Sequence, residues 1–480
     1  MGNNDTEDKI ATYFTNSQNL VVYMESSQLI DYITQREEAS GLYDIKIDGI
    51  SIYNYISRSV QVALMDHYGS GLNYKSPTVS NEERKRSLRK SFKQLARIII
   101  RCKKVDNIIR SFERVDFING NYVDKFTDPI VDYTDVGRSC LILEHGRAGR
   151  HLTPRLHSDL IIYVDFIYWL AWKFISLRKK VFYRKHSKKI DFLFSKIEST
   201  FPEIKIDRNS LFTTIVRFCF ITKCYNLLFK RIGAKRLFAP GRVGFKHLIP
   251  AARMQGLTVY ELQHGLVYSK SITYAGYHDP MFTPDYFLSF GKISNAENYG
   301  IKPEKLIEIG WGFNHYLKLR KDCVEVIDKG VFVISTPDVS ETMVSIVIRF
   351  AESFPNIMFS YRPHPLEVLS PETLNKMSQY KNITINDNAE NIFVSLAKYN
   401  NVLGSNSAAM YDALAMGKKV GKLEMLGLVP EFLDENDRNC FYLVSDEGTF
   451  EQFINAPMDD KPSKKNYSDF KPEVVNAFLK

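Results

Sequence analysis

Residues 401–423 read NVLGSNSAAMYDALAMGKKVGKL. An apolar strand ends at Leu403, small hydroxyl residues follow it, and an alanine-rich helix leads into a second apolar run. Two earlier segments, GVFVISTPD at 330–338 and IMFSYRPHP at 357–365, also read as a strand followed by a polar loop. Strands that alternate with helices form parallel sheets covered on both faces, so this half of the chain is predicted to be a doubly wound α/β domain.

The first half of the chain shows the same pattern. Residues 234–256 read as strand, glycine loop and helix, and LTVYELQHG at 257–265 reads as a strand that ends in a polar loop. SCLILEHGRAG at 139–149 is predicted to be another strand, and VDFINGNYV at 115–123 a short buried strand ending in a turn. A second parallel sheet is therefore predicted here.

The length of 480 residues suits roughly three ordinary domains or two large ones. The two alternating sets favour two. We predict a first domain at 1–280, a connection at 281–325 that carries two short strands at 285–291 and 306–310, a second domain at 326–455, and a tail at 456–480 that crosses back to the first domain.

Composition excludes several classes of protein. With 44% hydrophobic and 25% charged residues, the chain is neither disordered nor fibrous. Its six cysteines form no CxxC pair, which argues against a disulfide framework or a structural zinc site and favours a reducing compartment. The apolar run at 160–177 contains Asp165 and Lys173, so we interpret it as a buried strand and helix rather than a membrane span. We expect a soluble, cytoplasmic protein.

Ligands of doubly wound sheets bind beyond the carboxyl ends of the strands, which makes the loops at 362–365 and 404–412 candidates. A helix start rich in serine suits a phosphate, a carboxylate further along suits ribose hydroxyls, and an Arg-Pro-His-Pro loop offers a guanidinium and an imidazole to an anion. The simpler interpretations are a serine that caps a helix and a proline-rich turn. The candidate donor-binding residues are Arg362, His364, Ser405, Asn406, Ser407 and Asp412.

The first domain offers two candidates for a general base. His264 ends a strand before a glycine, and Glu144 follows another strand. The simpler interpretations are a structural histidine and a solvated loop. Neighbouring candidates that would line the cleft are Gln263, Gly265, Gly241 and Arg242.

Other chemistries lack their signatures in the sequence. The glycine loop at 241–244 has no Lys-Ser/Thr of a P-loop, and no GxGxxG follows the early strands. We find no DxD-type carboxylate pair at a strand end, so we expect no cofactor and no metal ion.

Three motifs, in this order, resemble a known family: ELQHG at 261–265, YRPHP at 361–365 and GSNSAAMYDALAMGKKV at 404–420. The chain resembles bacterial glycosyltransferases of the GT-B fold that build capsule, O-antigen (lipopolysaccharide) and teichoic-acid polymers. These include capsule synthases using CMP-sugars and CDP-glycerol glycerophosphotransferases. The resemblance covers about residues 235–425 and implies two facing Rossmann-like domains with parallel sheets.

The resemblance also implies roles. Arg362, His364, Ser405, Ser407 and Asp412 would bind a CMP-, UDP- or GDP-linked sugar donor, and His264 would be catalytic or close to it. Asn406 separates two serines where polyol-phosphate enzymes usually carry adjacent ones, which leaves the donor type open.

We therefore predict an inverting, metal-independent glycosyltransferase that acts on a surface polysaccharide or lipid-linked glycan. The alternatives are a CDP-polyol-dependent polyol-phosphate transferase, a sugar-nucleotide 2-epimerase, and a non-catalytic partner in a polysaccharide assembly complex.

Two stretches, 84–104 and 173–189, concentrate basic residues among aromatic ones. Such segments suit an anionic membrane surface, and a peripheral position at the inner face of the cytoplasmic membrane is the corresponding hypothesis. A solvated cationic helix face is the alternative. No recognisable nucleic-acid module accompanies the charge, so no nucleic-acid partner is expected.

Overall fold

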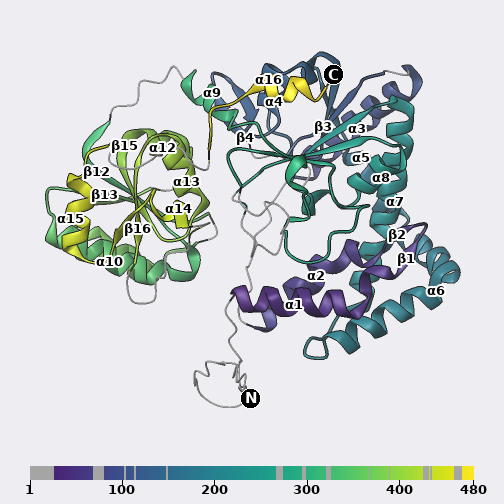
Figure 1. The fold of residues 1–480 in the computed structure, drawn as a ribbon, viewed down its shortest axis with the longest axis horizontal. Helices are drawn as coiled ribbons and strands as arrows, with labels where there is room; N and C mark the ends of the chain where they lie inside the picture. Colours follow the sequence, from purple (N-terminus) through teal and green to yellow (C-terminus); the bar gives the residue numbers. More distant parts are fainter. Residues whose placement is uncertain are drawn as a thin grey trace, which may run out of the picture.

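The computed structural model describes residues 26–68, 80–101, 104–112, 115–146, 150–265, 267, 274–293, 299–319, 326–365, 367–386, 388, 390–424, 432, 435–458 and 467–479. It contains two α/β units, each built on a parallel sheet with helices packed on its faces (Figure 1). This confirms the predicted α/β class and its two parallel sheets.

The first sheet has seven strands in the order β11-β10-β9-β8-β3-β6-β7, and every neighbouring pair is parallel. Its strands are β3 (Asn107–Arg110), β6 (Cys140–Glu144), β7 (Ile161–Tyr163), β8 (Arg236–Pro240), β9 (Thr258–Leu262), β10 (Tyr286–Ser289) and β11 (Leu306–Glu308). Alternate side chains face opposite layers: Ile108 packs toward α3 (Asn81–Arg101) and α7 (Arg208–Ile232), and Ile109 toward the C-terminal helix α16 (Pro472–Ala477).

The second sheet has six strands in the order β14-β13-β12-β15-β16-β17, again all parallel. The strands are β12 (Ile327–Ile334), β13 (Met358–Arg362), β14 (Ile383–Ile385), β15 (Tyr399–Gly404), β16 (Lys419–Leu423) and β17 (Tyr442–Val444). Its helices are α10 (Ser340–Ser353), α11 (Pro371–Ser378), α12 (Ile392–Lys398), α13 (Ala408–Ala415), α14 (Glu435–Arg438) and α15 (Glu447–Asn455).

A helical layer is formed by segments that come before β3 and between β7 and β8 in the sequence. It comprises α1 (Ser26–Ser40), the short strands β1 (Lys46–Ile47) and β2 (Ile50–Ser51), α2 (Tyr53–His67) and α6 (Ile175–Thr200). These elements share one apolar cluster with the first part of α7. The sequence pattern did not predict this layer, which lies below the first sheet in Figure 1.

The predicted connection at 281–325 needs correction in its bounds. The two short strands expected in it are β10 and β11, and they extend the first sheet. Beyond them, α9 (Phe313–Lys318) precedes the second sheet. A second correction concerns 115–123, which forms an antiparallel hairpin of β4 (Val115–Ile118) and β5 (Asn121–Asp124) rather than one strand. Its turn, Asn119-Gly120, has positive φ at both residues, as two-residue hairpins require.

The C-terminal segment lies on the first domain after leaving the second (Figure 1). The backbone of Ser468 donates to Phe290 O at 2.8 Å and accepts from Trp311 N at 2.9 Å. Gly310 permits the close approach, since its φ is 78° and a Cβ there would lie 2.0 Å from the carbonyl oxygen of Asp469. The two domains are thus tied together by the end of the chain as well as by α9.

Helices α4 (Asp128–Tyr133), α5 (Asp165–Lys173) and α8 (Leu248–Met254) complete the first domain. The long helix α7 begins where the Asp207 carboxylate accepts the backbone N–H groups of Asn209 and Ser210, and it ends at Gly233 in the left-handed conformation.

Candidate functional site

The predicted donor loops lie side by side at the carboxyl edge of the second sheet. Ile334, the last residue of β12, is in register with Arg362 on β13 and with Gly404 on β15. The backbone N–H of Ser335 also donates to Arg362 O at 3.0 Å. The loops after the three strands therefore start at one level, and the structure brings the RPHP loop and the serine-rich helix start together.

The helix start at 405–407 combines a cap with an open loop. Ser407 is the N-cap of α13 and accepts the backbone N–H of Ala409 at 3.4 Å, while Ser405 is buried and Asn406 is exposed. One turn further, Asp412 accepts a hydrogen bond from the Tyr467 hydroxyl at 3.2 Å. The capping interpretation thus holds for Ser407, and the positive end of α13 still faces this edge of the sheet.

The side chain of Arg362 lies inside the domain, with 9% of its surface exposed. Its guanidinium donates to Asn386 Oδ1 at 3.1 Å and to Ser395 Oγ at 3.2 Å. Neighbouring side chains on a strand point to opposite faces, and Tyr361 reaches Ser335 Oγ on the other side at 2.8 Å. Arg362 therefore holds the loops after β13 and β14 in place, and His364, which is half-buried, is the side chain nearer the loop surface.

His264 follows β9 at the carboxyl edge of the first sheet and is partly exposed. Its ring packs on Phe112, which follows β3, with 5.1 Å between centroids. Gly241, which follows β8, has a φ of 74°, and a Cβ there would lie 2.5 Å from His264 Cε1. A glycine is needed at this position for the imidazole to lie across the end of β8.

The other predicted cleft residues of this edge fix the loops. Gln263 accepts the Phe290 N–H at 2.7 Å and donates to Gly265 O at 2.8 Å, which joins the ends of β9 and β10. The Arg242 Nε atom donates to Glu261 Oε2 at 2.8 Å. These contacts fix the loops on either side of His264.

Glu144 lies in a buried network of charged side chains and is 2% exposed. One oxygen contacts His151 Nδ1 at 2.6 Å and the other accepts from Arg155 at 2.8 Å. The second ring nitrogen of His151 contacts Asp165 at 2.9 Å. Burial disfavours the charged imidazole, but the hydrogen bonds to Asp165 and Glu144 outweigh it and raise the pKa of His151 to about 9.

The two candidate bases are not neighbours. Glu144 ends β6, three strands from β9 in the order β9-β8-β3-β6, which corresponds to about 14 Å at the usual strand spacing. Both oxygens of Glu144 are engaged and the group is enclosed, whereas His264 is partly exposed at its edge of the sheet.

Aromatic side chains connect His264 with the donor loops of the second domain. They are Phe112, Phe126, Phe290 and Tyr467. From His264 onward, successive ring centroids lie 5.1, 5.6, 6.1 and 5.5 Å apart, and the Tyr467 hydroxyl then reaches Asp412. This aromatic bridge places the carboxyl edges of both sheets at the same interdomain surface. Sequence reasoning missed it because its members come from four separate segments, and a lone phenylalanine after a strand carries no signal.

The described residues contain no group of three or more His, Cys, Asp or Glu side chains arranged to hold a metal ion.

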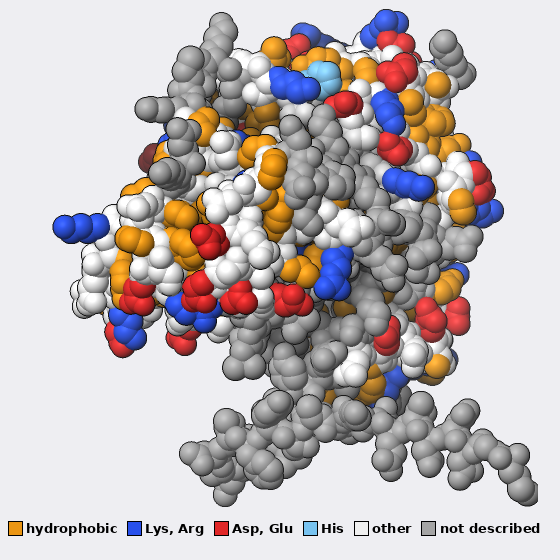
Figure 2. All heavy atoms as spheres, turned by 60° about the vertical axis from the view of Figure 1, so that its left-hand side comes forward, with side chains coloured by type: hydrophobic (Ala, Val, Ile, Leu, Met, Phe, Trp, Pro, Cys, Tyr) orange, Lys and Arg blue, Asp and Glu red, His pale blue; other side chains and the backbone are white. Residues whose placement is uncertain are grey.

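Figure 2 brings the second domain forward. On the face of the domain seen there, hydrophobic and uncharged side chains cover much of the surface, and charged ones gather along the lower rim.

No family model and no curated protein matches the chain. Among solved structures, UDP-GlcNAc 2-epimerase from Methanocaldococcus jannaschii is similar with 10% identity and a TM-score of 0.49, covering 78% of this chain and 98% of that one. The Neisseria meningitidis UDP-GlcNAc 2-epimerase bound to UDP-GlcNAc has 12% identity, a TM-score of 0.46 and coverage of 78% and 98%. The wall teichoic acid polymerase TagF has 11% identity, a TM-score of 0.37 and coverage of 84% and 93%. These likenesses concern the fold and say nothing of the site residues.

Proposed function

We propose that the protein is a nucleotide-sugar-dependent glycosyltransferase, with the donor held by the second domain and the acceptor by the first. The observation that carries this proposal is the aromatic bridge, which links His264 to Asp412 on α13, the helix that follows the loop at 405–407. The acceptor class we propose is a surface polysaccharide or a lipid-linked glycan, such as a capsule or O-antigen precursor.

The donor half of the site is suited to a diphosphate. The N-terminus of α13 presents its positive dipole end, and His364 would supply a hydrogen-bond donor across the end of β12. As the bond between the anomeric carbon and the phosphate oxygen breaks, negative charge builds on the leaving nucleotide. Preorganised donors stabilise that charge without a cation.

The first domain, which would bind the acceptor glycan, supplies the general base. The imidazole of His264 would take the proton of the acceptor hydroxyl while the hydroxyl oxygen bonds to the anomeric carbon and the nucleotide leaves from the opposite face. The configuration at that carbon would invert. The aromatic side chains between the two edges would keep water from competing as the acceptor.

A thermal-shift screen with CMP, UDP and GDP, and with their sugars, tests the donor half. We expect one nucleotide to raise the unfolding temperature selectively, and the His364→Ala variant to lose the shift. Because a charge-assisted hydrogen bond is worth about 1.5–3 kcal/mol, the variant should bind that nucleotide at least about tenfold more weakly. His67→Ala, at an exposed end of α2, is the matched control.

The same screen, extended with CDP-glycerol and with an assay of donor consumption, separates the alternatives. Consumption of a UDP-linked HexNAc without any acceptor would indicate a 2-epimerase, and a selective response to CDP-glycerol a polyol-phosphate transferase. The absence of any nucleotide response would favour a non-catalytic role and would contradict the proposal.

We further propose that the first domain lies against an anionic membrane. Helices α3, α5, α6 and α7 expose large apolar side chains: Phe92, Ile99, Ile100, Trp169, Trp172, Phe174, Leu177, Val181 and Leu227. A groove of apolar character between α3, α5 and α7 includes Phe92, Ile99 and Leu227. By length and composition α7 could cross a membrane, and 39% of its most apolar window is buried in the protein.

Cations surround these apolar side chains. On α3 the exposed ones are Arg84, Lys85, Arg86, Arg89, Lys90, Lys93, Arg97 and Arg101, and on α5 and α6 they are Lys173, Lys180, Arg184, Lys185, Lys188 and Lys189. Each basic residue near an anionic leaflet contributes about 1 kcal/mol, so the combination supports interfacial binding.

Vesicle co-sedimentation checks this surface. The protein should pellet with vesicles containing phosphatidylserine, and less so as salt screens the charges. The double variant Ile100→Asp/Leu227→Asp should lose most of this binding, since the two side chains are 78% and 67% exposed. Val368→Asp, 81% exposed on the second domain, is the control. Equal pelleting of all three proteins would contradict this placement.

A further inference from the structure

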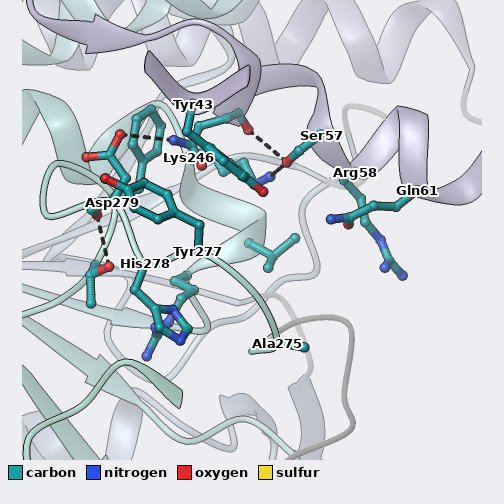
Figure 3. A pocket seen from close by; sticks show the side chains of 14 residues that line it. Tyr43, Ser57, Arg58, Gln61, Lys246, Ala275, Tyr277, His278 and Asp279 are labelled. Carbon is teal, nitrogen blue, oxygen red and sulfur yellow. Dashed lines mark hydrogen bonds between the residues drawn. The ribbon is translucent and has the colours of Figure 1, made fainter. Parts of the chain in front are cut away.

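Apart from the candidate site, a polar pocket lies in the first domain, between α2, the loop after β8 and the loop before β10 (Figure 3). The cavity has a volume of about 70 Å³, which leaves room for one small oxyanion. In Figure 3, Arg58 and Gln61 of α2 lie on one side, and Tyr277 and His278 on the other.

Cationic side chains dominate the lining. Arg58, Arg242 and Lys246 all contribute to it, whereas Asp279 is the acidic residue of the wall. The Asp279 carboxylate already accepts from Asn54 Nδ2 at 3.0 Å and from the backbone N–H of Met281 at 2.9 Å. The lining thus holds three basic side chains and one acidic one.

Arg242 provides an independent sign of a missing ligand. Its Nε and Nη1 atoms are bound at 2.8 Å by Glu261 and by Tyr299 O. The Nη2 atom, in contrast, is buried without a hydrogen-bond partner among the described residues, although the side chain is 8% exposed. A buried guanidinium N–H without a partner is costly, and an anion in the pocket would satisfy it.

Lys246 is held at the pocket by the hydroxyl of Ser57, to which its Nζ donates at 2.7 Å. Burial lowers the pKa of Lys246 to about 8, in spite of the attraction of Glu37 and with the repulsion of Arg58. The negative charge of an occupant would favour the protonated amine. The carboxylate of Glu37 itself is enclosed by Tyr43, Tyr53 and Gln61.

The walls also suit a sugar. Tyr43 and Tyr277 lie with ring centroids 4.8 Å apart, and Tyr277 is 42% exposed at the rim. The pocket shares the loop after β8 with the candidate base, because Gly241 lies against His264 and the next residue, Arg242, lines the pocket. A glycan anchored here would pass close to His264.

We propose that this pocket binds an oxyanion, a phosphate or a carboxylate, carried by the acceptor glycan away from its reacting hydroxyl. Arg58, Arg242 and Lys246 bind the anion, and the tyrosines pack on the adjoining sugar. The assignment of the anion to an acceptor rests on the proposed function. The binding of an anion does not.

Isothermal titration calorimetry on the full chain, without any nucleotide, tests the pocket. Three probes separate the sources of the anion: inorganic phosphate, glucose 1-phosphate and uncharged glucose. We expect the wild type to bind the sugar phosphate more tightly than phosphate at millimolar concentrations, with glucose the weakest. Arg58→Gln and Lys246→Met should each weaken both anions at least tenfold, and Arg84→Gln, exposed on α3, should change nothing.

The outcomes are distinct. Absence of anion binding by the wild type, or binding unchanged in both variants, would overturn the proposal. Tighter binding of free phosphate than of the sugar phosphate would overturn the acceptor assignment. The nucleotide-induced thermal shift should persist in both variants, which shows that they are folded. If the wild type binds the anion but shows no nucleotide-induced shift, the proposed function is contradicted and the anion site is not.

Discussion

Replacing His264 by alanine is expected to lower the rate of sugar transfer by about 100-fold or more. A positioned general base contributes about 10²–10⁴-fold, and His264 is the histidine at the carboxyl edge of the first sheet that the aromatic bridge connects to the donor loops. The measurement is single-turnover transfer from the donor that the thermal-shift screen identifies. His264→Ala should keep the nucleotide-induced shift, because the donor is bound by the other domain.

A steric variant tests the position of the imidazole without touching it. Gly241→Ala would place a Cβ 2.5 Å from His264 Cε1, so the ring must move and transfer should fall by about tenfold or more. Gly256→Ala is a matched control, since Gly256 has a similar φ of 70° but no atom within 4 Å of the added Cβ. The control carries the same backbone strain, so equal losses of transfer in both variants would show that strain, and not the imidazole, is responsible.

The arrangement of strands could be predicted because it depends on local patterns. The apolar runs that end at Leu403 and Tyr361 are long enough to be recognised, and parallel strands necessarily bring their following loops to one edge. By contrast, β10 and β11 could be recognised as short strands, but no local pattern shows that they join the first sheet. The helical layer of α1, α2 and α6 is likewise held by contacts between distant segments.

The roles of individual side chains were harder to predict, because they depend on which face a residue takes. A shift of one position separates Tyr361 from Arg362, and it turns the guanidinium toward Asn386 instead of the loop surface. Arg242 is similar: its partner Glu261 lies on the neighbouring strand, and only the register of β8 and β9 brings the two together. The loops were therefore predictable, whereas the partners of their charged residues were not.

Glu144→Gln is expected to destabilise the fold by about 3 kcal/mol while sparing the chemistry. The substitution keeps the shape but leaves Arg155 and His151 without the carboxylate that both contact, and breaking a buried ion pair costs about 3–5 kcal/mol. Urea unfolding measures the loss. Glu447→Gln is the control, because its ion pair with Arg349 is exposed and such pairs are worth about 0–1 kcal/mol.

The pH dependence of stability distinguishes this network from a catalytic role. The pKa of His151 is raised to about 9 in the folded protein, against about 6.5 for a free histidine, so the folded state binds the extra proton between these values. The contribution of His151 to the free energy of unfolding is complete below about pH 6.5. It is lost as the pH rises through 9, which lowers the free energy of unfolding by up to about 3 kcal/mol. In Glu144→Gln the decrease should be smaller, because one of the two carboxylates that hold the proton is gone. If Glu144 were instead the catalytic base, the variant would also lose transfer by about 100-fold under conditions in which it is fully folded.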